Sequence, residues 1–83
     1  MENSRIALLG IIVEDLASAD EINRLLHDAG QFIVGRMGIP YRSRGISIIS
    51  VVMDGPQDKI SALSGKLGML PGVSVKTVYS KKG

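Results

Sequence analysis

The sequence predicts an α+β fold with the element order β-α-β-β-α-β. Two runs rich in branched aliphatic residues, 5–13 and 45–54, are typical of the most buried strands of a sheet. After each run, apolar residues recur at helical spacing, and 31–39 and 73–79 supply two further strands. Two right-handed crossovers joined by a hairpin arrange these elements as a ferredoxin-like two-layer sandwich, a four-stranded antiparallel sheet with two helices on one face. The first and third strands are then central, in agreement with their being the most apolar.

The first strand spans about Arg5 to Val13, and a helix follows it. The N-terminus of this helix has two candidate caps, Asp15 and Ser18, of which Ser18 begins a Ser-Ala-Asp-Glu capping-box pattern. Gly30 is placed to end the helix. Its apolar side is formed by residues at helical spacing, namely Leu16, Ala19, Ile22, Leu25, Leu26 and Ala29.

The second strand runs from about Gln31 to Ile39, and we expect Pro40 to break it, because proline cannot donate to a strand ladder. Residues 41–44 form a hairpin tip before the third strand. We expect Asp54, with Gly55-Pro56, to open the second helix. The apolar side of that helix is formed by Ile60, Leu63 and Leu67, with Leu70 just past its end.

Both central strands are apolar on both faces. In the first, Ile6, Leu8 and Ile12 alternate with Ala7, Leu9, Ile11 and Val13, and in the third, Ile46, Ile48 and Val52 alternate with Ile49, Val51 and Met53. A two-layer sandwich needs only one apolar sheet face, since water wets the other. We therefore expect a second copy of the chain to cover the open face. The pattern does not say which set faces outward, so Ile48 and Ile49 are both candidate contacts.

Four stretches of the chain resemble one known family. They are IIVED at 11–15, INRLLHDAG at 22–30, RMGIPYR at 36–42 and ALSGKLGMLPGVSVKT at 62–77. In these stretches the chain resembles the iron-only hydrogenase system regulators, and LSGKLG followed by GV and VKT is the most specific part. The resemblance implies a single ACT-like regulatory domain over residues 1–83, similar in fold to the effector domain of nickel-responsive regulators. It also implies an association with iron-only hydrogenase assembly.

The chain carries few groups for catalysis or metal binding. It has no cysteine and one histidine, His27, on the side of its helix away from the apolar residues. The histidine and cysteine ligands of the nickel-responsive regulators are therefore missing, and so are the partners of a catalytic triad. Oxygen ligands from Glu14, Asp15 and Asp54 would suit a hard cation, but acids at strand-to-helix junctions are more simply explained as caps. We expect no enzyme, no metal and no cofactor.

The hairpin tip is the candidate site for a ligand or partner. ACT-like domains often hold small effectors at the turn from first strand to first helix, where glycine exposes backbone amides. Here that turn, 13–16, has no glycine and carries two acids, which would repel a carboxylate. Because arginines suit an anion or an acidic partner surface, we place the site at Arg36, Tyr41, Arg42 and Arg44. The other explanation is a solvated tip that its arginines keep soluble.

The second helix contains Gly65, which costs about 1 kcal/mol relative to alanine. Helical spacing places it away from the apolar side, together with Ser61 and Ala62. Small residues let another backbone approach closely. We therefore predict a contact with another copy or a partner along this stripe, although a tolerated glycine explains the same pattern. Gly68 is placed to end the helix.

The charge distribution makes nucleic acid an alternative partner. Acids dominate residues 1–34 and bases dominate 35–83, with a net charge of +2. The basic half is diluted and has no dense run before the Lys81-Lys82 tail, so we expect no nucleic acid. We also expect no membrane partner, because the apolar run 6–13 is too short to span a bilayer. Because the first strand begins by Arg5, we expect no separate DNA-binding module before it.

Together these observations predict a cytoplasmic, non-enzymatic regulatory or sensory domain of the iron-only hydrogenase system. We expect it to act as a homodimer or homotetramer, with a hydrogenase-system or other regulatory protein as a candidate second partner. Two alternatives stay open. One is a small-molecule or anion-binding effector module that acts through a partner protein, and the other is a weak nucleic-acid-binding transcriptional regulator.

Overall fold

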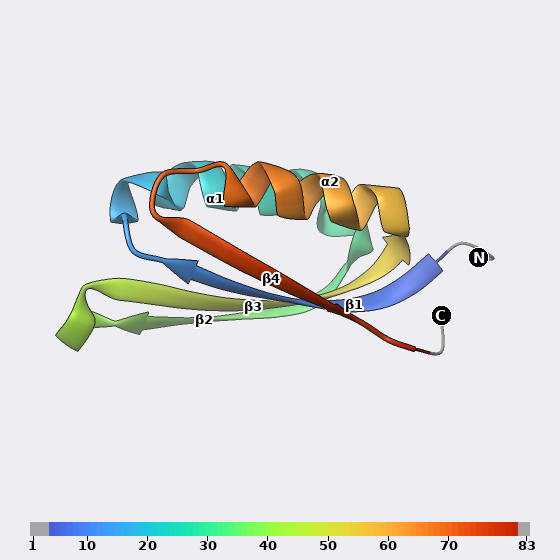
Figure 1. The fold of residues 1–83 in the computed structure, drawn as a ribbon, viewed down its shortest axis with the longest axis horizontal. Coiled ribbons are helices and arrows are strands. Elements are labelled where there is room, and N and C mark those ends of the chain that lie inside the picture. The colour runs from blue at the N-terminus through green and yellow to red at the C-terminus, as the bar shows by residue number, and fades with distance from the viewer. Residues whose placement is uncertain (1–3, 82–83) are drawn as a thin grey trace.

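The computed structural model describes residues 4–81, which form four strands, two helices and three one-turn 3-10 helices. The strands are β1 (Ser4–Val13), β2 (Ile33–Tyr41), β3 (Ile46–Pro56) and β4 (Val73–Tyr79). The helices are α1 (Ala19–Asp28) and α2 (Gln57–Gly68), and the short ones are η1 (Leu16–Ser18), η2 (Gly30–Phe32) and η3 (Arg42–Arg44). The strands lie in the order β2-β3-β1-β4, all antiparallel, and both helices cover one face of the sheet (Figure 1). The predicted ferredoxin-like fold class is confirmed.

Strand alternation and helical spacing meet in one core between the sheet and the helices. The strands contribute Ala7, Leu9, Ile11 and Val13 from β1, and Ile49, Val51 and Met53 from β3. The helices contribute Ile22, Leu25 and Leu26 from α1, and Ile60, Leu63 and Leu67 from α2. Full burial stabilises the fold by about 1.5–3 kcal/mol for each large aliphatic side chain, so this core supplies most of the driving force.

Strand β2 differs from the prediction at both ends. It begins at Ile33, because residues 30–32 form the short helix η2. It then continues through Pro40, which pairs in register with Ser47, and ends at Tyr41. The expectation that Pro40 breaks the strand is wrong because β2 is an edge strand of the sheet, where proline is tolerated.

The N-terminus of α1 differs from the capping-box pattern. The Asp15 carboxylate accepts a hydrogen bond from the Ala17 amide at 3.0 Å and so caps η1. Ser18 precedes α1 but makes no side-chain capping bond. Its buried hydroxyl instead donates to the Pro71 carbonyl at 2.8 Å. The Ser18 hydroxyl therefore bonds to a distant segment of the chain instead of capping an amide of α1.

The start of α2 also differs from the prediction. Asp54 stays within β3, paired with Ile6 of β1, and the helix begins at Gln57. Pro56 occupies the N-cap position without a side-chain hydrogen bond. Pairing of β3 with β1 extends to Pro56. Residues 54–56 therefore stay in the strand, although the sequence Asp-Gly-Pro favours a turn.

Two turns lock together at the end of the molecule where α1 begins. Gly72 adopts a left-handed backbone with φ 69°, and its carbonyl accepts a hydrogen bond from the Glu14 amide at 2.7 Å. A Cβ atom on Gly72 would lie 2.6 Å from the Cβ of Asp15 and 2.7 Å from its backbone nitrogen. The two backbones approach so closely only because residue 72 has no side chain. The turn before β4 therefore holds the start of α1 in place.

Candidate functional site

The hairpin of β2 and β3 extends beyond the layer of helices, as Figure 1 shows. On β2, Arg36, Gly38 and Pro40 pair with core-facing positions of β3, so they lie on the helix side of the sheet. Even so, every residue from 34 to 41 is exposed. The projecting hairpin therefore leaves space between itself and the start of α1.

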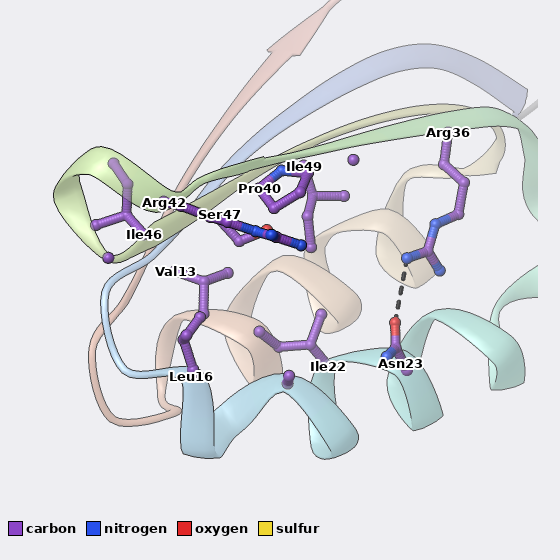
Figure 2. Close-up of a pocket in the computed structure, with 13 residues that line it drawn as sticks. Val13, Leu16, Ile22, Asn23, Arg36, Pro40, Arg42, Ile46, Ser47 and Ile49 are labelled. Atoms are coloured by element: carbon purple, nitrogen blue, oxygen red, sulfur yellow. Dashed lines mark hydrogen bonds between the residues drawn. The ribbon is translucent and has the colours of Figure 1, made fainter.

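This space is a pocket of about 540 Å³. Its walls are mostly apolar, with Val13, Leu16, Ala19 and Ile22 from the α1 side and Pro40, Ile46 and Ile49 from the hairpin (Figure 2). The polar side chains in its lining are Asn23, Arg36, Arg42 and Ser47. No aspartate or glutamate of the described chain is among the lining residues. The pocket is thus apolar in its walls and cationic where it is polar.

The two arginines of the pocket have no acidic partner within residues 4–81. Arg36 donates one hydrogen bond, to the amide oxygen of Asn23 at 3.1 Å. Arg42 extends from the hairpin into the space between Pro40 and Ile22 (Figure 2), and no hydrogen bond or ion pair holds its guanidinium in the described chain. Both positive charges are available to an external anion.

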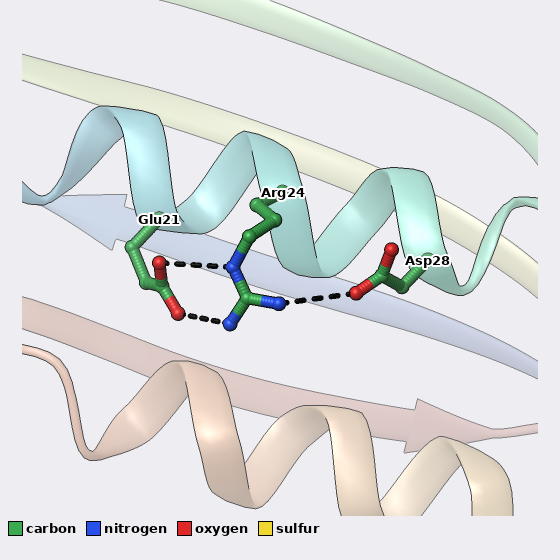
Figure 3. A network of polar contacts seen from close by, with 3 residues as sticks. All are labelled: Glu21, Arg24 and Asp28. Carbon is green, nitrogen blue, oxygen red and sulfur yellow. Dashed lines mark hydrogen bonds and ion pairs between the residues drawn. The ribbon is translucent and has the colours of Figure 1, made fainter.

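A third arginine shows the contrast. Arg24 of α1 pairs with Glu21 and, at 3.2 Å, with Asp28, and the three partly exposed side chains lie on the side of α1 that is turned toward α2 (Figure 3). The hydrogen bond from the Arg24 guanidinium lowers the pKa of the Glu21 carboxyl below its ordinary value. This cation is satisfied by its own helix, at the spacing that favours such pairs.

The structure brings together two of the four residues expected at the hairpin site. Arg36 and Arg42 line the pocket. Tyr41 pairs with Ile46 at an outward position of β2, and Arg44 lies in η3 outside the pocket lining. That these side chains bind an anion or partner stays a prediction.

Part of the pocket was not foreseen from the sequence. Helical spacing predicts Leu16 and Ala19 on the buried side of the first helix, but Leu16 is 57% exposed and both residues line the pocket. Asn23, which orients Arg36, was not singled out. Its position on α1 carries no local signal, because its partner lies on another element 13 residues away.

The second candidate surface is the open face of the sheet. Nine large apolar residues point outward there and are 37–65% exposed: Ile6, Leu8, Ile12, Met37, Ile39, Tyr41, Ile48, Val52 and Val78. The charged strand residues on this face of the described chain are Asp54 and Lys76. Ile48 belongs to the face, whereas Ile49 is 8% exposed and lies in the core. The prediction that Ile49 contacts another molecule is therefore wrong, because the helices of its own chain cover it.

The stripe on α2 is exposed as its spacing predicted. Ser61, Ala62 and Gly65 all face away from the core, and a Cβ atom on Gly65 would meet no atom within 4 Å. The Ser61 hydroxyl lies 3.3 Å from the Tyr79 hydroxyl. A contact of this stripe with another molecule stays a prediction.

No three histidine, aspartate or glutamate side chains within residues 4–81 gather closely enough to hold a metal ion. Glu14 and Asp15 follow the C-terminal end of β1, whereas Asp54 pairs with Ile6 near its start. Asp54 therefore lies near the opposite end of β1 from Glu14 and Asp15, so these three acids do not form the hard-cation site that the sequence offered as an alternative. His27 is exposed, as its spacing predicted. Neither helix of the described chain has the length and apolar character needed to cross a membrane.

Comparison with known proteins places the fold and the sequence in one family. Residues 5–77 match the model of the TM1266-like family, which is described as a family of iron-only hydrogenase system regulators. The structure of protein TM1266 from Thermotoga maritima is 40% identical, with a TM-score of 0.90 over 94% of this chain and 99% of that one. A search of curated proteins found no match.

Two more distant structures share the fold alone. The C-terminal domain of the MgtC protein from Mycobacterium tuberculosis is 13% identical, with a TM-score of 0.72 over 98% of this chain and 93% of that one. A formyltetrahydrofolate deformylase from Pseudomonas putida KT2440 is 14% identical, with a TM-score of 0.64 over 88% of this chain and 28% of that one. The family match across most of the chain and the 40% identity to TM1266 show that this protein belongs to the TM1266-like family of iron-only hydrogenase system regulators.

Proposed function

We propose that this protein is a non-catalytic, cytoplasmic regulatory module of the iron-only hydrogenase system that acts as a homo-oligomer. The observation that carries the proposal is the open face of the sheet, with its nine exposed apolar side chains. Monomeric proteins rarely expose apolar patches larger than a few hundred Å². The role of the family in the hydrogenase system supports the regulatory part of the proposal.

A second copy of the chain is the cover that this face fits best. A two-fold axis places the same patch on both subunits, so that one apolar face covers the other. Its charged residues, Asp54 and Lys76, are few enough that most of the buried area would be apolar. Such an interface resembles a protein core divided between two chains. The homodimer is the smallest assembly that removes the patch from water, and a homotetramer uses the same contact twice.

A lysine on a central strand of this face tests the assembly. Ile48→Lys would bury an unpaired charge in the interface, which is strongly unfavourable. We expect native mass spectrometry to give a dimer or tetramer for the unmodified chain at micromolar concentration, and monomer or insoluble protein for the variant. The matched control is Met69→Lys, since Met69 is 85% exposed beyond the end of α2 and lies off the sheet.

The control should keep the mass of the unmodified chain. Should Ile48→Lys be insoluble, Ile48→Ser gives the same test with a milder loss of apolar area. A stable monomer of the unmodified chain at micromolar concentration would contradict the proposal, and so would a variant at position 48 with unchanged mass.

A second candidate function is effector binding, and the pocket between α1 and the hairpin favours it. Its volume of about 540 Å³ lies within the range typical of small-molecule sites. The basic side chains of the described chain are distributed over β1, α1, the hairpin, α2 and the open sheet face rather than gathered in one strip. For this reason we propose a small effector and no nucleic acid.

A further inference from the structure

We propose that the pocket between α1 and the β2–β3 hairpin binds a small monocarboxylate with a branched aliphatic or aromatic body. The carboxylate would be held by Arg42 and Arg36, and the body would rest on the apolar walls. This inference deepens the effector function proposed for the same pocket and rests on it. It does not depend on assembly through the open sheet face.

The charges of the pocket select an anion. Arginine side chains commonly pair with carboxylates, as Arg24 does with Glu21 and Asp28 on the surface of α1. Arg36 has only the neutral amide of Asn23, and Arg42 has no hydrogen-bond or ion-pair partner within residues 4–81. Guanidinium groups bind carboxylates in a planar, bidentate geometry. An anion from outside the chain would supply the negatively charged partner that Arg36 and Arg42 lack within residues 4–81.

The walls select a ligand that is apolar apart from that anion. Val13, Leu16 and Ile22 form one side, and Pro40, Ile46 and Ile49 form the other. A small inorganic anion would leave these side chains in water, and a polyanion would have to lose hydration against them. A branched or aromatic body removes apolar surface from water on both sides. The single hydroxyl of Ser47 adds one further hydrogen-bonding group.

The backbone of the hairpin places Arg42 in this position. Gly45, which also lines the pocket, adopts a left-handed conformation with φ 66°, and its amide donates to the Arg42 carbonyl at 3.2 Å. The resulting tight turn carries Arg42 on the pocket side, while Arg44 of the same turn lies outside the lining. The hairpin tip therefore has one arginine in the pocket, Arg42, and a second arginine outside it, Arg44, which serves as a control.

The test is a titration of the full chain with small compounds, in which NMR records the amide chemical shifts of the pocket residues. The compounds are 4-methylpentanoate, its neutral amide, acetate and inorganic phosphate. We expect 4-methylpentanoate to bind with saturable shifts around the pocket. The amide lacks the charge and acetate lacks the body, so each should bind about tenfold more weakly or worse. Phosphate should also bind more weakly, because it has no apolar part.

Variants assign the contact to particular side chains. Arg42→Met and Arg36→Met keep an unbranched apolar stem and remove the charge, and each should weaken 4-methylpentanoate binding by about tenfold or more. Arg44→Met is the matched control and should bind as the unmodified chain does. Oligomer mass is measured in every sample, so a failure of assembly is distinguishable from a failure of binding.

Three results would overturn the inference. The first is the absence of saturable shifts at the pocket with 4-methylpentanoate at millimolar concentration. The second is equal binding of the amide, or unchanged binding by Arg42→Met. The third is phosphate binding at the pocket more tightly than the carboxylate, which would leave an effector site but assign it to another class of anion.

Discussion

Three glycines allow one substitution to be compared in three environments. Gly65, Gly45 and Gly72, each changed to alanine, gain the same methyl group. At Gly65 the helix is open around the new atom, with nothing within 4 Å. At Gly45 the space is also open, but φ is 66°. At Gly72 φ is 69° and the new atom would lie 2.6 Å from the Cβ of Asp15.

The expected changes in the free energy of unfolding follow from these facts. Gly65→Ala should stabilise by about 0.5–1 kcal/mol, since alanine is the better helix former and restricts the unfolded chain. Gly45→Ala should cost about 1–2 kcal/mol for a left-handed L-residue. Gly72→Ala should cost that amount and about 1–3 kcal/mol more, because the turn carrying Asp15 must move away. The hydrogen bond from Glu14 to Gly72 is in the same turn and would be strained with it.

Thermal and urea unfolding at one fixed protein concentration measure the series, since assembly makes the midpoint depend on concentration. For a domain of this size, 1 kcal/mol shifts Tm by about 4–8 °C. From most to least stable, the expected order is Gly65→Ala, the unmodified chain, Gly45→Ala and Gly72→Ala. A Gly72→Ala variant no less stable than Gly45→Ala would refute the assignment of a close backbone contact at Asp15.

The Gly65→Ala variant also tests the contact predicted for its stripe. If another surface meets this helix at Gly65, the methyl group reduces oligomer mass or partner binding while the helix itself gains stability. If the glycine is only tolerated, stability rises and assembly stays intact. Native mass spectrometry of this one variant separates the two cases.

Three further predictions concern single contacts. Replacing Arg42 and Arg44 together by alanine should leave Tm almost unchanged, since exposed charges contribute little to stability; a large loss would show that they hold the fold. The lowered pKa of Glu21 means that its stabilising pair with Arg24 is present above about pH 4.5 and is lost as pH falls through the lowered pKa. Acid titration of stability should therefore become slightly shallower in Arg24→Ala, and an identical profile would argue against the pair. Gly55→Ala should cost about 1–3 kcal/mol in urea unfolding, because its Cβ would lie 2.7 Å from the phenylalanine ring of η2; an unchanged midpoint would show that the ring moves freely.

The sequence alone determined the fold class, the element types and the central strands. Alternation along β1 and β3 and helical spacing along the two helices are local patterns, and most of the residues they mark for the core are buried, although Leu16 is exposed and Ala19 and Ala29 are only partly buried. Such patterns are reliable because each residue's face depends only on its neighbours along the chain. The excess of apolar residues on the sheet is likewise visible in the order of residues along the two central strands.

Tertiary structure decided where elements begin and end. Pro40 continues β2 because that strand lies at the sheet edge, and Asp54 stays in β3 because β1 pairs with it. Ser18 turns from helix cap to tertiary donor because Pro71, 53 residues later, lies beside it. Local preferences differ by about 1 kcal/mol, which a ladder or a buried hydrogen bond readily outweighs.

Only the tertiary structure distinguished Ile48 from Ile49 and assembled the pocket. Both isoleucines fit a central strand equally well, and the choice depends on which sheet face the helices cover. Arg42 lines the same pocket as residues of α1 only because the hairpin projects past the helices and turns at Gly45. The sequence determines the chemistry of each side chain, but the distance between two side chains on separate elements depends on how those elements pack.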